Sequence, residues 1–298
     1  MTSETFIAMD GKHLECTLWD DVRRPIGVVQ IIHGMDEHVG RYDRFAKFLN
    51  KHGYIVFGDD HRAHGRTARN VSKIGQTDGS RNLFMDTVAD EMEIYEYLRG
   101  RFNLPVFIFG HSYGSFITQR LIHTYNFCAA GVCLSGTARY PRTIAAIGAV
   151  MAWIGKSLFG ADAPARFLEL FSPIRGEKNG QSKLTRDAHQ VALHNADPMR
   201  AKYFSYGFYY SLFSNMMHLG MPSCKTMSVM IIGGSQDAVS MNGRFARRLW
   251  RIYRNGGMQD ITITIYPDAR HELLMETNYD EVQQDILTFL KYAHHKRP

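Results

Sequence analysis

Short runs of apolar residues alternate with longer segments of helical spacing along most of this 298-residue chain. Continuous apolar runs predict buried strands, and apolar residues three or four positions apart predict amphipathic helices. The predicted strands cover residues 4–9, 13–19, 27–32, 54–57, 106–109, 131–134, 228–232 and 261–266. The predicted helices between them cover residues 42–52, 86–102, 115–122, 242–254 and 279–294. This alternation favours a mostly parallel, eight-stranded sheet with helices on both faces.

The succession of strands stops between Gly136 and about Pro222. This segment is aromatic, and its apolar spacing predicts helices near residues 144–154, 165–171, 183–195 and 203–219. An insertion at this point would lie over the carboxyl ends of the parallel strands, where sites form in such sheets. The predicted organisation is therefore a core of residues 1–135 and 223–298 with a helical cap at 136–222.

One stretch, residues 106–115, combines a predicted strand, a G-x-S-x-G turn and the start of a predicted helix. In that context the motif marks a nucleophilic serine held on a strained turn. Gly110 and Gly114 have no β-carbon, so neighbouring backbone can approach the turn closely. Ser112 would then stand at a helix N-terminus, whose amides stabilise negative charge. The stretch predicts Ser112 as a catalytic nucleophile.

A nucleophilic serine needs a histidine base, and the histidine needs a carboxylate to orient it. In this architecture the acid and then the base follow the serine, each just after a later strand. Asp237 and His271 occupy these two positions. Asp268 is a rival acid, but it shares a loop with His271, whereas the orienting residue should come from another strand end. The predicted triad is Ser112, Asp237 and His271.

Composition and charge narrow the remaining choices. Hydrophobic residues make up 45% of the chain, which is ample for a sizeable core. Lysine and arginine exceed aspartate and glutamate by 35 − 29 = 6, a mild and scattered excess. Five arginines between residues 244 and 254 share one helical face, which we interpret as a solvated surface. We recognise no nucleic-acid-binding module, and we expect no nucleic acid as a partner.

The cysteines and the apolar runs bear on location. Cys16, Cys128, Cys133 and Cys224 show no close pairing pattern, which favours free thiols in a reducing compartment. The polar N-terminus does not resemble a signal peptide. The longest uncharged apolar run, residues 144–154, is shorter than the roughly 17–25 residues that span a bilayer. We therefore expect a cytoplasmic protein.

Four histidines gather in two predicted loops, but they do not predict a metal site. His33, His38, His61 and His64 match no zinc-binding spacing with nearby carboxylates or thiols. We interpret them as residues that position the loops around the site. The predicted chemistry needs neither a metal nor an organic cofactor.

Several motifs together resemble one known family, the α/β-hydrolases of the serine aminopeptidase-like group, close to bacterial monoacylglycerol lipases and lysophospholipases. The resemblance covers nearly the whole chain, and its motifs lie at residues 33–42, 59–67, 110–115, 184–187, 196–198, 234–240 and 269–272. It implies an α/β-hydrolase fold and an oxyanion hole made by the backbone N–H groups of Met35 and Tyr113. Two mild departures are Ala63, where glycine is usual, and Ala238, where proline is usual.

The predicted function is hydrolysis of carboxylic esters of single-chain lipids, monoacylglycerol or lysophospholipid, through an acyl-enzyme on Ser112. The cap is too rich in apolar residues to bury them all internally, so part of it should line a tunnel for the acyl chain. The residues expected there are Ile147, Met151, Phe204, Phe208 and Leu212. The apolar residues of the cap are also compatible with a peripheral contact between the cap and a membrane.

Other functions fit the same machinery, because a fold does not fix a substrate. The triad would also serve a peptidase, a thioesterase or an acyltransferase, and a non-catalytic binding protein could retain the fold. A peptidase of this fold would need a charged group for the amine of its substrate. Asp36, Glu37 and Glu169 are the candidates for that role.

Overall fold

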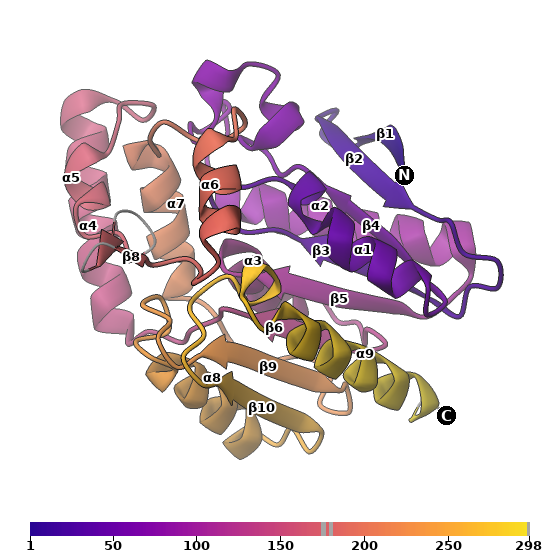
Figure 1. The fold of residues 1–298 in the computed structure, drawn as a ribbon. Helices are drawn as coiled ribbons and strands as arrows, with labels where there is room; N and C mark the ends of the chain where they lie inside the picture. The colour runs from indigo at the N-terminus through magenta and orange to yellow at the C-terminus, as the bar shows by residue number, and fades with distance from the viewer. Residues whose placement is uncertain (174–176, 179–180, 297–298) are drawn as a thin grey trace.

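The computed structural model describes residues 1–173, 177–178 and 181–296. Its centre is an eight-stranded sheet with the strand order β1-β2-β4-β3-β5-β6-β9-β10 (Figure 1). The pairs β1–β2 and β2–β4 are antiparallel, and every other neighbouring pair in this sheet is parallel. The predicted fold class is therefore confirmed. The strands are β1 (Thr2–Ile7), β2 (His13–Trp19), β3 (Gly27–Ile32), β4 (Tyr54–Asp59), β5 (Val106–His111), β6 (Val132–Ser135), β9 (Val229–Gly234) and β10 (Ile261–Tyr266).

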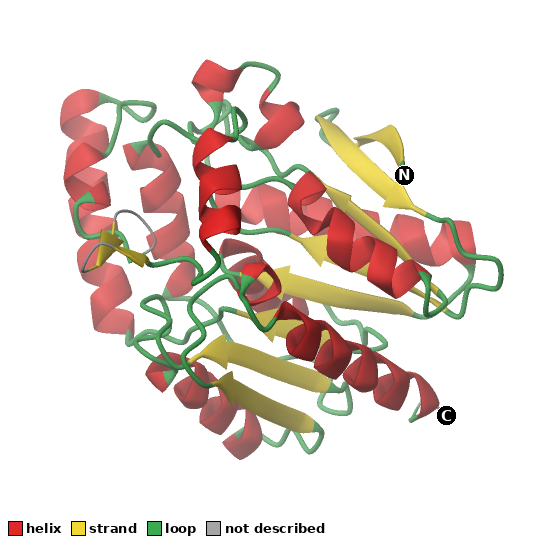
Figure 2. Ribbon diagram, in the orientation of Figure 1, coloured by secondary structure: helices red, strands yellow, loops and turns green. Residues whose placement is uncertain are grey.

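Helices cover both faces of this sheet (Figure 2). They are α1 (Asp43–Asn50), α2 (Leu83–Phe102), α3 (Tyr113–Thr124), α8 (Arg244–Asn255) and α9 (Tyr279–His295). One apolar cluster joins α2, α3 and α8 to one face of the sheet, and a second cluster joins α1 and α9 to the other. Every residue of the central strands β3, β4, β5, β6 and β9 is buried. Burial on both faces explains why these strands are continuous apolar runs in the sequence.

The cap helices lie beyond the carboxyl ends of the parallel strands (Figure 1). They are α4 (Arg142–Phe159), α5 (Arg166–Glu169), α6 (Ala188–Ala196) and α7 (Tyr206–Met216), with a small hairpin of β7 (Glu177–Lys178) and β8 (Gln181–Ser182). Sequence reasoning missed the hairpin and made α5 three residues too long. The boundaries at residues 136 and 222 stay a prediction.

The two long cap helices, α4 and α7, pack closely because two glycines face large rings. A β-carbon at Gly155 would come within 2.2 Å of the Tyr206 ring, and one at Gly148 within 2.8 Å of the Phe213 ring. Larger side chains at either position would push the helices apart. Helical spacing in the sequence indicates the two helices, but not this contact between them.

The prediction of four free thiols is wrong for two of the cysteines. Cys128 and Cys224 form a disulfide with a Cα–Cα distance of 5.5 Å, while Cys16 and Cys133 are free and buried. The chain that returns from the cap runs along α3, where the Ser223 N–H donates to the Ile122 carbonyl at 2.8 Å. This path brings together two cysteines that are 96 residues apart in the sequence. A spacing that large gives no local pairing signal.

Candidate active site

Ser112 occupies a tight turn between β5 and α3. Its φ is 50° and its ψ is −116°, a conformation that non-glycine residues rarely adopt. Neighbouring atoms leave no room for side chains at the flanking glycines. A β-carbon at Gly114 would lie 2.0 Å from the Ile32 carbonyl oxygen, and one at Gly110 would lie 2.3 Å from Thr118 Oγ1. Both glycines are therefore required by close approach, and the turn holds Ser112 above the strand end.

The structure brings Ser112, His271 and Asp237 together from three different strand ends. His271 Nε2 lies 2.8 Å from Ser112 Oγ, and His271 Nδ1 lies 3.0 Å from Asp237 Oδ1. All three side chains are buried. With Nδ1–H donating to Asp237, Nε2 is free to accept the serine proton. This is the arrangement that activates a serine for nucleophilic attack.

The electrostatics of the pair favour a charged histidine. Burial alone would lower the pKa of His271, but the charge and hydrogen bond of Asp237 outweigh it and raise that pKa above its usual value. Burial also works to raise the pKa of Asp237, yet the facing imidazole holds it below its usual value. Asp237 would thus remain ionised and stabilise the imidazolium that forms when Ser112 attacks.

Asp268, the rival acid, points elsewhere. It is exposed, and its Oδ1 accepts a hydrogen bond from Gln236 Nε2 at 3.2 Å. Its backbone N–H donates to Ser235 Oγ at 2.8 Å. Asp268 therefore links the loop after β10 to the loop after β9, and Asp237 is the carboxylate that contacts His271.

Met35 and Tyr113, the two residues of the implied oxyanion hole, both lie near Ser112. Met35 follows β3 and lines both cavities that reach Ser112, while Tyr113 is the first residue of α3. Within the described part of the chain, neither backbone N–H donates to a protein acceptor. Two N–H groups left for an incoming oxygen fit an oxyanion hole. The role of both residues stays a prediction.

Glu37 and Arg41 join the loop after β3 to the loop that carries the histidine. Glu37 accepts hydrogen bonds from the Gly34 N–H, from Tyr42 Oη at 2.8 Å and from Arg41 Nη1 at 3.0 Å. Arg41 also donates two hydrogen bonds of 2.8 Å to Glu272, the residue after His271. The sequence favours a structural role in the loop for Glu37, but it does not reveal the link to the histidine loop, although Glu37 and Arg41 both lie in the motif at residues 33–42. The ion pairs fix the two loops relative to each other.

The same network sets two opposite pKa shifts. Burial raises the pKa of Glu37 above its usual range. Burial would also raise the pKa of Glu272, but the bidentate contact with Arg41 outweighs it and lowers that pKa. Glu272 therefore carries the firm negative charge that balances Arg41.

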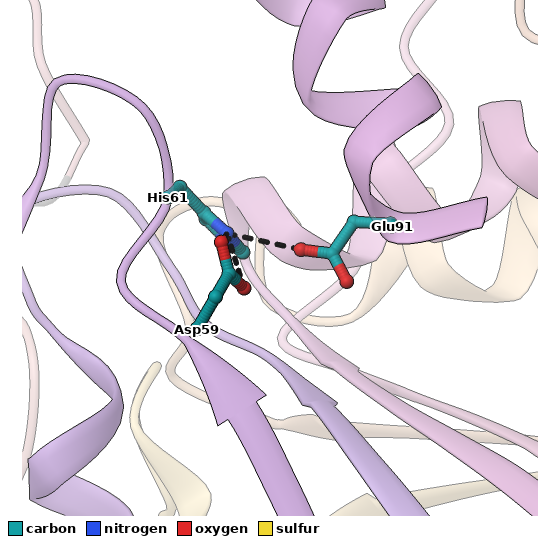
Figure 3. A group of neighbouring side chains, drawn as sticks. All are labelled: Asp59, His61 and Glu91. Carbon is teal, nitrogen blue, oxygen red and sulfur yellow. Dashed lines mark hydrogen bonds and ion pairs between the residues drawn. The ribbon is translucent and has the colours of Figure 1, made fainter. Parts of the chain in front are cut away.

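A buried cluster of Asp59, His61 and Glu91 supports the loop after β3 from the core side (Figure 3). His61 Nδ1 lies 3.2 Å from Asp59 Oδ1 and 3.1 Å from Glu91 Oε1. On its other side, His61 Nε2 donates to the His33 carbonyl at 3.1 Å, and the His61 N–H donates to His33 Nε2 at 3.0 Å. The cluster thus anchors His33, two residues before Met35.

Two carboxylates and an imidazole within 4.8 Å are also a donor set that a divalent cation accepts. Protons on Glu91 and His61 also offset the negative charges of this cluster. Burial raises the pKa of Glu91 to about 8, so its carboxyl is mostly protonated at neutral pH. Burial would lower the pKa of His61, but the charge of Asp59 outweighs it and raises that pKa well above its usual value. His61 thus links Asp59 and Glu91 to the loop that carries His33, and the positioning role of these histidines stays a prediction.

Two cavities of opposite character meet at Ser112. The larger has a volume of about 590 Å³ and an apolar wall built by the cap and the core. Of the predicted tunnel residues, Ile147, Met151 and Leu212 line it. The smaller cavity, of about 280 Å³, is mostly polar. Its described lining includes Asp36, Glu37, His111, His194, Asn195, Arg200 and Glu272.

The prediction that Phe204 and Phe208 line the tunnel is wrong. They are 0% and 1% exposed and do not belong to the wall of either cavity. The Phe208 ring lies 5.3 Å from the Tyr113 ring, and both phenylalanines pack near His64. They seal the cap onto the core. Tyr209, Phe213 and Met216, farther along α7, line the apolar cavity in their place.

Comparison with known proteins agrees with this geometry. The family described as "Serine aminopeptidase, S33", a family of hydrolases, matches residues 23–278, most of the chain. This chain therefore belongs to that family, and the resemblance inferred from the motifs is confirmed.

Individual relatives match over almost the full length. The chain is 24% identical to a monoacylglycerol lipase of Mycolicibacterium smegmatis, over 97% of this chain and 96% of that protein. It is 23% identical to the monoglyceride lipase of Rattus norvegicus, over 93% of this chain and 85% of that protein. A solved carboxyl esterase from Bacillus coagulans, in complex with glycerol, superimposes with a TM-score of 0.84 at 25% identity and covers 98% of both chains.

Proposed function

We propose that this protein is a serine hydrolase that cleaves carboxylic esters of single-chain lipids, with monoacylglycerol as the preferred class. The observation that carries the proposal is the position of Ser112 between an apolar cavity of about 590 Å³ and a polar cavity of about 280 Å³. A monoacyl ester has the same two parts, a hydrocarbon chain and a polar alcohol, joined at the bond that a serine attacks. Its family membership and its lipase and esterase relatives support the same activity.

The reaction follows from the geometry of the three side chains. Ser112 Oγ attacks the ester carbonyl carbon while His271 Nε2 takes the hydroxyl proton. The carbonyl oxygen becomes an oxyanion, which accepts hydrogen bonds from the Met35 and Tyr113 N–H groups. The imidazolium returns its proton to the leaving alcohol, and the acyl group stays on Ser112. Water, deprotonated by His271, then attacks the acyl carbon. The imidazolium returns this proton to Ser112 Oγ as the acyl–oxygen bond breaks and the fatty acid leaves.

The apolar cavity suits the acyl chain. Its wall is made mainly of aliphatic and aromatic side chains, including Ile147, Met151 and Leu212. Each methylene transferred there from water contributes about 0.8 kcal/mol, close to fourfold in affinity. The catalytic efficiency should therefore rise with chain length until the cavity is full.

The charges of the polar cavity favour a neutral alcohol over a phosphate headgroup. Arg200 is paired with Asp36 at 3.0 Å, and Arg41, behind the wall, is paired with Glu272 at 2.8 Å. Burial lowers the pKa of His111 to about 3 and that of His194 below its usual value, so both are neutral. Arg200, the arginine among the described lining residues, is thus already paired with a carboxylate. A phosphate would meet carboxylates without a spare cation, whereas a glycerol group would find hydrogen-bond partners.

The peptidase alternative is weaker, because its three candidate amine-binding carboxylates are already engaged. Asp36 pairs with Arg200, and Glu37 pairs with Arg41 at 3.0 Å. Glu169 accepts a hydrogen bond of 2.6 Å from the Phe204 N–H. A peptide amine would have to displace one of these contacts.

We also propose that the cap rests on a lipid surface. Large apolar side chains are exposed along α4 and around α5, namely Ile144, Ile147, Val150, Trp153, Ile154, Leu158, Phe159, Phe167, Leu170 and Phe171. By length and composition α4 could cross a membrane, and 22% of it is buried. Its packing against α7 instead supports a helix that lies on the bilayer beside the mouth of the apolar cavity. An exposed patch of this kind commonly marks a contact with membrane or protein.

The membrane contact can be tested by sedimentation with neutral phosphatidylcholine vesicles. Replacing Trp153 and Leu158 together by serine should reduce vesicle binding, while the matched change Met9→Ser, at an exposed methionine outside the cap, should not. Equal binding by both variants would contradict this contact.

The hydrolase itself is tested by a series of p-nitrophenyl esters from acetyl to palmitoyl, beside an aminoacyl amide. We expect kcat/KM to climb with acyl length and then level off, and we expect the amide to be cleaved more slowly than the esters. A fluorophosphonate probe should label wild type at Ser112. Faster cleavage of the amide, or a steady fall from acetyl onward, would mean that the lipid ester assignment is wrong.

A further inference from the structure

Asp36 has a backbone φ in the left-handed region. It follows Met35 directly, it is 3% exposed, and its φ is 65°. Residues other than glycine seldom adopt positive φ, and such strain persists only where the surroundings hold it in place. This strained residue lies next to a predicted oxyanion donor, so contacts from elsewhere in the fold must hold its backbone in place.

The cap supplies the contacts. Asp36 Oδ1 accepts a hydrogen bond of 2.8 Å from the Ala201 N–H, and Asp36 Oδ2 accepts hydrogen bonds from Arg200 Nη2 at 3.0 Å and Arg200 Nε at 3.3 Å. Nearby, His38 Nε2 lies 2.9 Å from Asp197 Oδ2. All the cap residues in these contacts belong to one short segment, 197–201, between α6 and α7.

Arg200 carries the connection on to α6. Its Nη1 donates to the His194 carbonyl at 3.3 Å and to Asn195 Oδ1 at 3.1 Å, both in the last turn of that helix. In Figure 1, α6 lies between α7 and the helices of the core. Arg200 therefore bridges the end of a cap helix and the loop that contains Met35.

We propose that Asp36 is a positioning residue through which the seating of cap segment 197–201 sets the Met35 N–H of the oxyanion hole. This inference rests on the proposed function. The loop after β3 is held from three directions: His33 from the core by His61, Gly34 by Glu37, and Asp36 by the cap. Of these three anchors, the third depends on the cap, so the oxyanion hole is complete when the cap segment is in place.

The physical argument concerns geometry and charge. An oxyanion donor works only within about 2.7–3.1 Å of the developing negative charge, so a small rotation at Asp36 would misplace the preceding N–H. Arg200 also neutralises the Asp36 carboxylate, one residue from the donor. Without Arg200, the loop would lose an anchor, and the Asp36 carboxylate would lose the guanidinium that faces it, beside the place where the oxyanion forms.

The test uses the full-length protein with Asp36→Gly, Arg200→Gln and Arg200→Lys. Glycine tolerates a φ of 65°, so Asp36→Gly removes the anchor without adding strain. Arg166→Gln is the matched control, since Arg166 is an exposed cap arginine on α5. The substrate is p-nitrophenyl butyrate, whose short acyl chain makes little use of the apolar cavity.

We expect Asp36→Gly and Arg200→Gln each to lower kcat by about tenfold to a hundredfold, less than the loss of a whole oxyanion donor. KM should change by less than about threefold, because the ground state binds before the oxyanion forms. Arg200→Lys should retain part of the activity, and Arg166→Gln should behave as wild type. The double variant Asp36→Gly/Arg200→Gln should be no slower than the slower single variant, because both changes break the same contact.

Wild-type kcat in both single variants, an effect on KM alone, or additive losses in the double variant would each overturn the proposal. Arg200 is partly exposed, so Arg200→Gln gives a folded reference if Asp36→Gly does not fold. Failure of this inference is distinguishable from failure of the proposed function. In the first case wild type still hydrolyses the ester, and in the second it neither hydrolyses it nor reacts with a fluorophosphonate.

Discussion

The two cavities that meet at Ser112 differ in what builds them and in how they select a ligand. The apolar cavity is walled mainly by residues of α4, α7 and the core, and few polar groups reach it. The polar cavity is walled by α6, by the loop after β3 and by the loop that carries His271. An apolar wall selects by size and chain length, whereas a polar wall selects by hydrogen bonding and charge.

The difference shows how one enzyme can hold the two ends of a lipid ester by separate means. Changes on α4 or α7 should alter the acyl preference and leave the alcohol preference intact, and changes among the cavity-lining residues of α6 should do the reverse. The triad lies where the two cavities join, so it serves both. The experiments below first alter the triad, where the two cavities meet, and then examine the properties of its base and of each cavity separately.

The largest effect is expected at the nucleophile. Ser112→Ala should retain the fold and lower kcat by about 10⁴–10⁶, as for other triad serines. Ester turnover and thermal unfolding of the purified variant give the two readings. Turnover close to that of wild type would show that Ser112 is not the nucleophile. The point where the two cavities meet would then not be the catalytic site.

The second largest effect is expected at Asp237, the acid of the triad. Asp237→Asn should lower kcat by about 10⁴, because an amide stabilises the wrong histidine tautomer. Asp268→Asn is the matched control and should cost about tenfold or less, since Asp268 contacts Gln236 instead of His271. The measurement is kcat for the same ester under the same conditions. If the control lost more activity than Asp237→Asn, the triad acid would have to be reassigned.

A smaller and more selective effect is expected from narrowing the apolar cavity. Met151 lines the cavity on α4, and its neighbour Val150 is 55% exposed. Met151→Trp should lower kcat/KM for a palmitoyl ester by about tenfold or more, while the acetyl ester changes little, because excluded methylenes each forfeit about 0.8 kcal/mol. Val150→Trp, the control, should leave the ratio of the two substrates unchanged. An equal loss on both substrates would show that this cavity does not receive the acyl chain.

The smallest effect is a shift of the pH profile. His271 must be neutral to accept the serine proton, so kcat/KM should fall as the pH drops through its pKa. Because Asp237 raises that pKa, the midpoint in wild type should lie above the usual value of 6.5. In Asp237→Asn the residual activity should show a lower midpoint, since burial without the carboxylate lowers the pKa. A midpoint that does not move would mean that Asp237 does not control the base.

Sequence reasoning located the sheet and the triad candidates because their signals are local. A strand buried on both faces is apolar throughout, and Ser112 carries a strand, two glycines and a helix in one stretch. Asp237 and His271 each follow a strand that can be recognised, so the architecture predicts where they meet. No sequence signal links the three residues to one another directly. Each is located by its own strand, and the fold then brings them together.

The features that sequence reasoning missed depend on which residues meet across long separations. Hydrophobicity showed that Phe204 and Phe208 would be buried, but not whether they face the cavity or the core. The Cys128–Cys224 disulfide joins residues 96 positions apart. The Arg41–Glu272 pair joins residues 231 positions apart, and the Arg200–Asp36 pair joins residues 164 apart. Polar pairs of this kind have no periodicity, so only the folded chain reveals them.

The comparison of the two cavities leads to one decisive measurement, kcat/KM for two lipids with the same palmitoyl chain. One is the neutral 1-monoacylglycerol, and the other is the lysophosphatidate that carries a phosphate on the same glycerol. The apolar cavity treats both alike, so any difference reports on the polar cavity. We predict a preference for the monoacylglycerol of at least about tenfold, equivalent to about 1.4 kcal/mol. Equal efficiency, or a preference for the lysophosphatidate, would contradict the account.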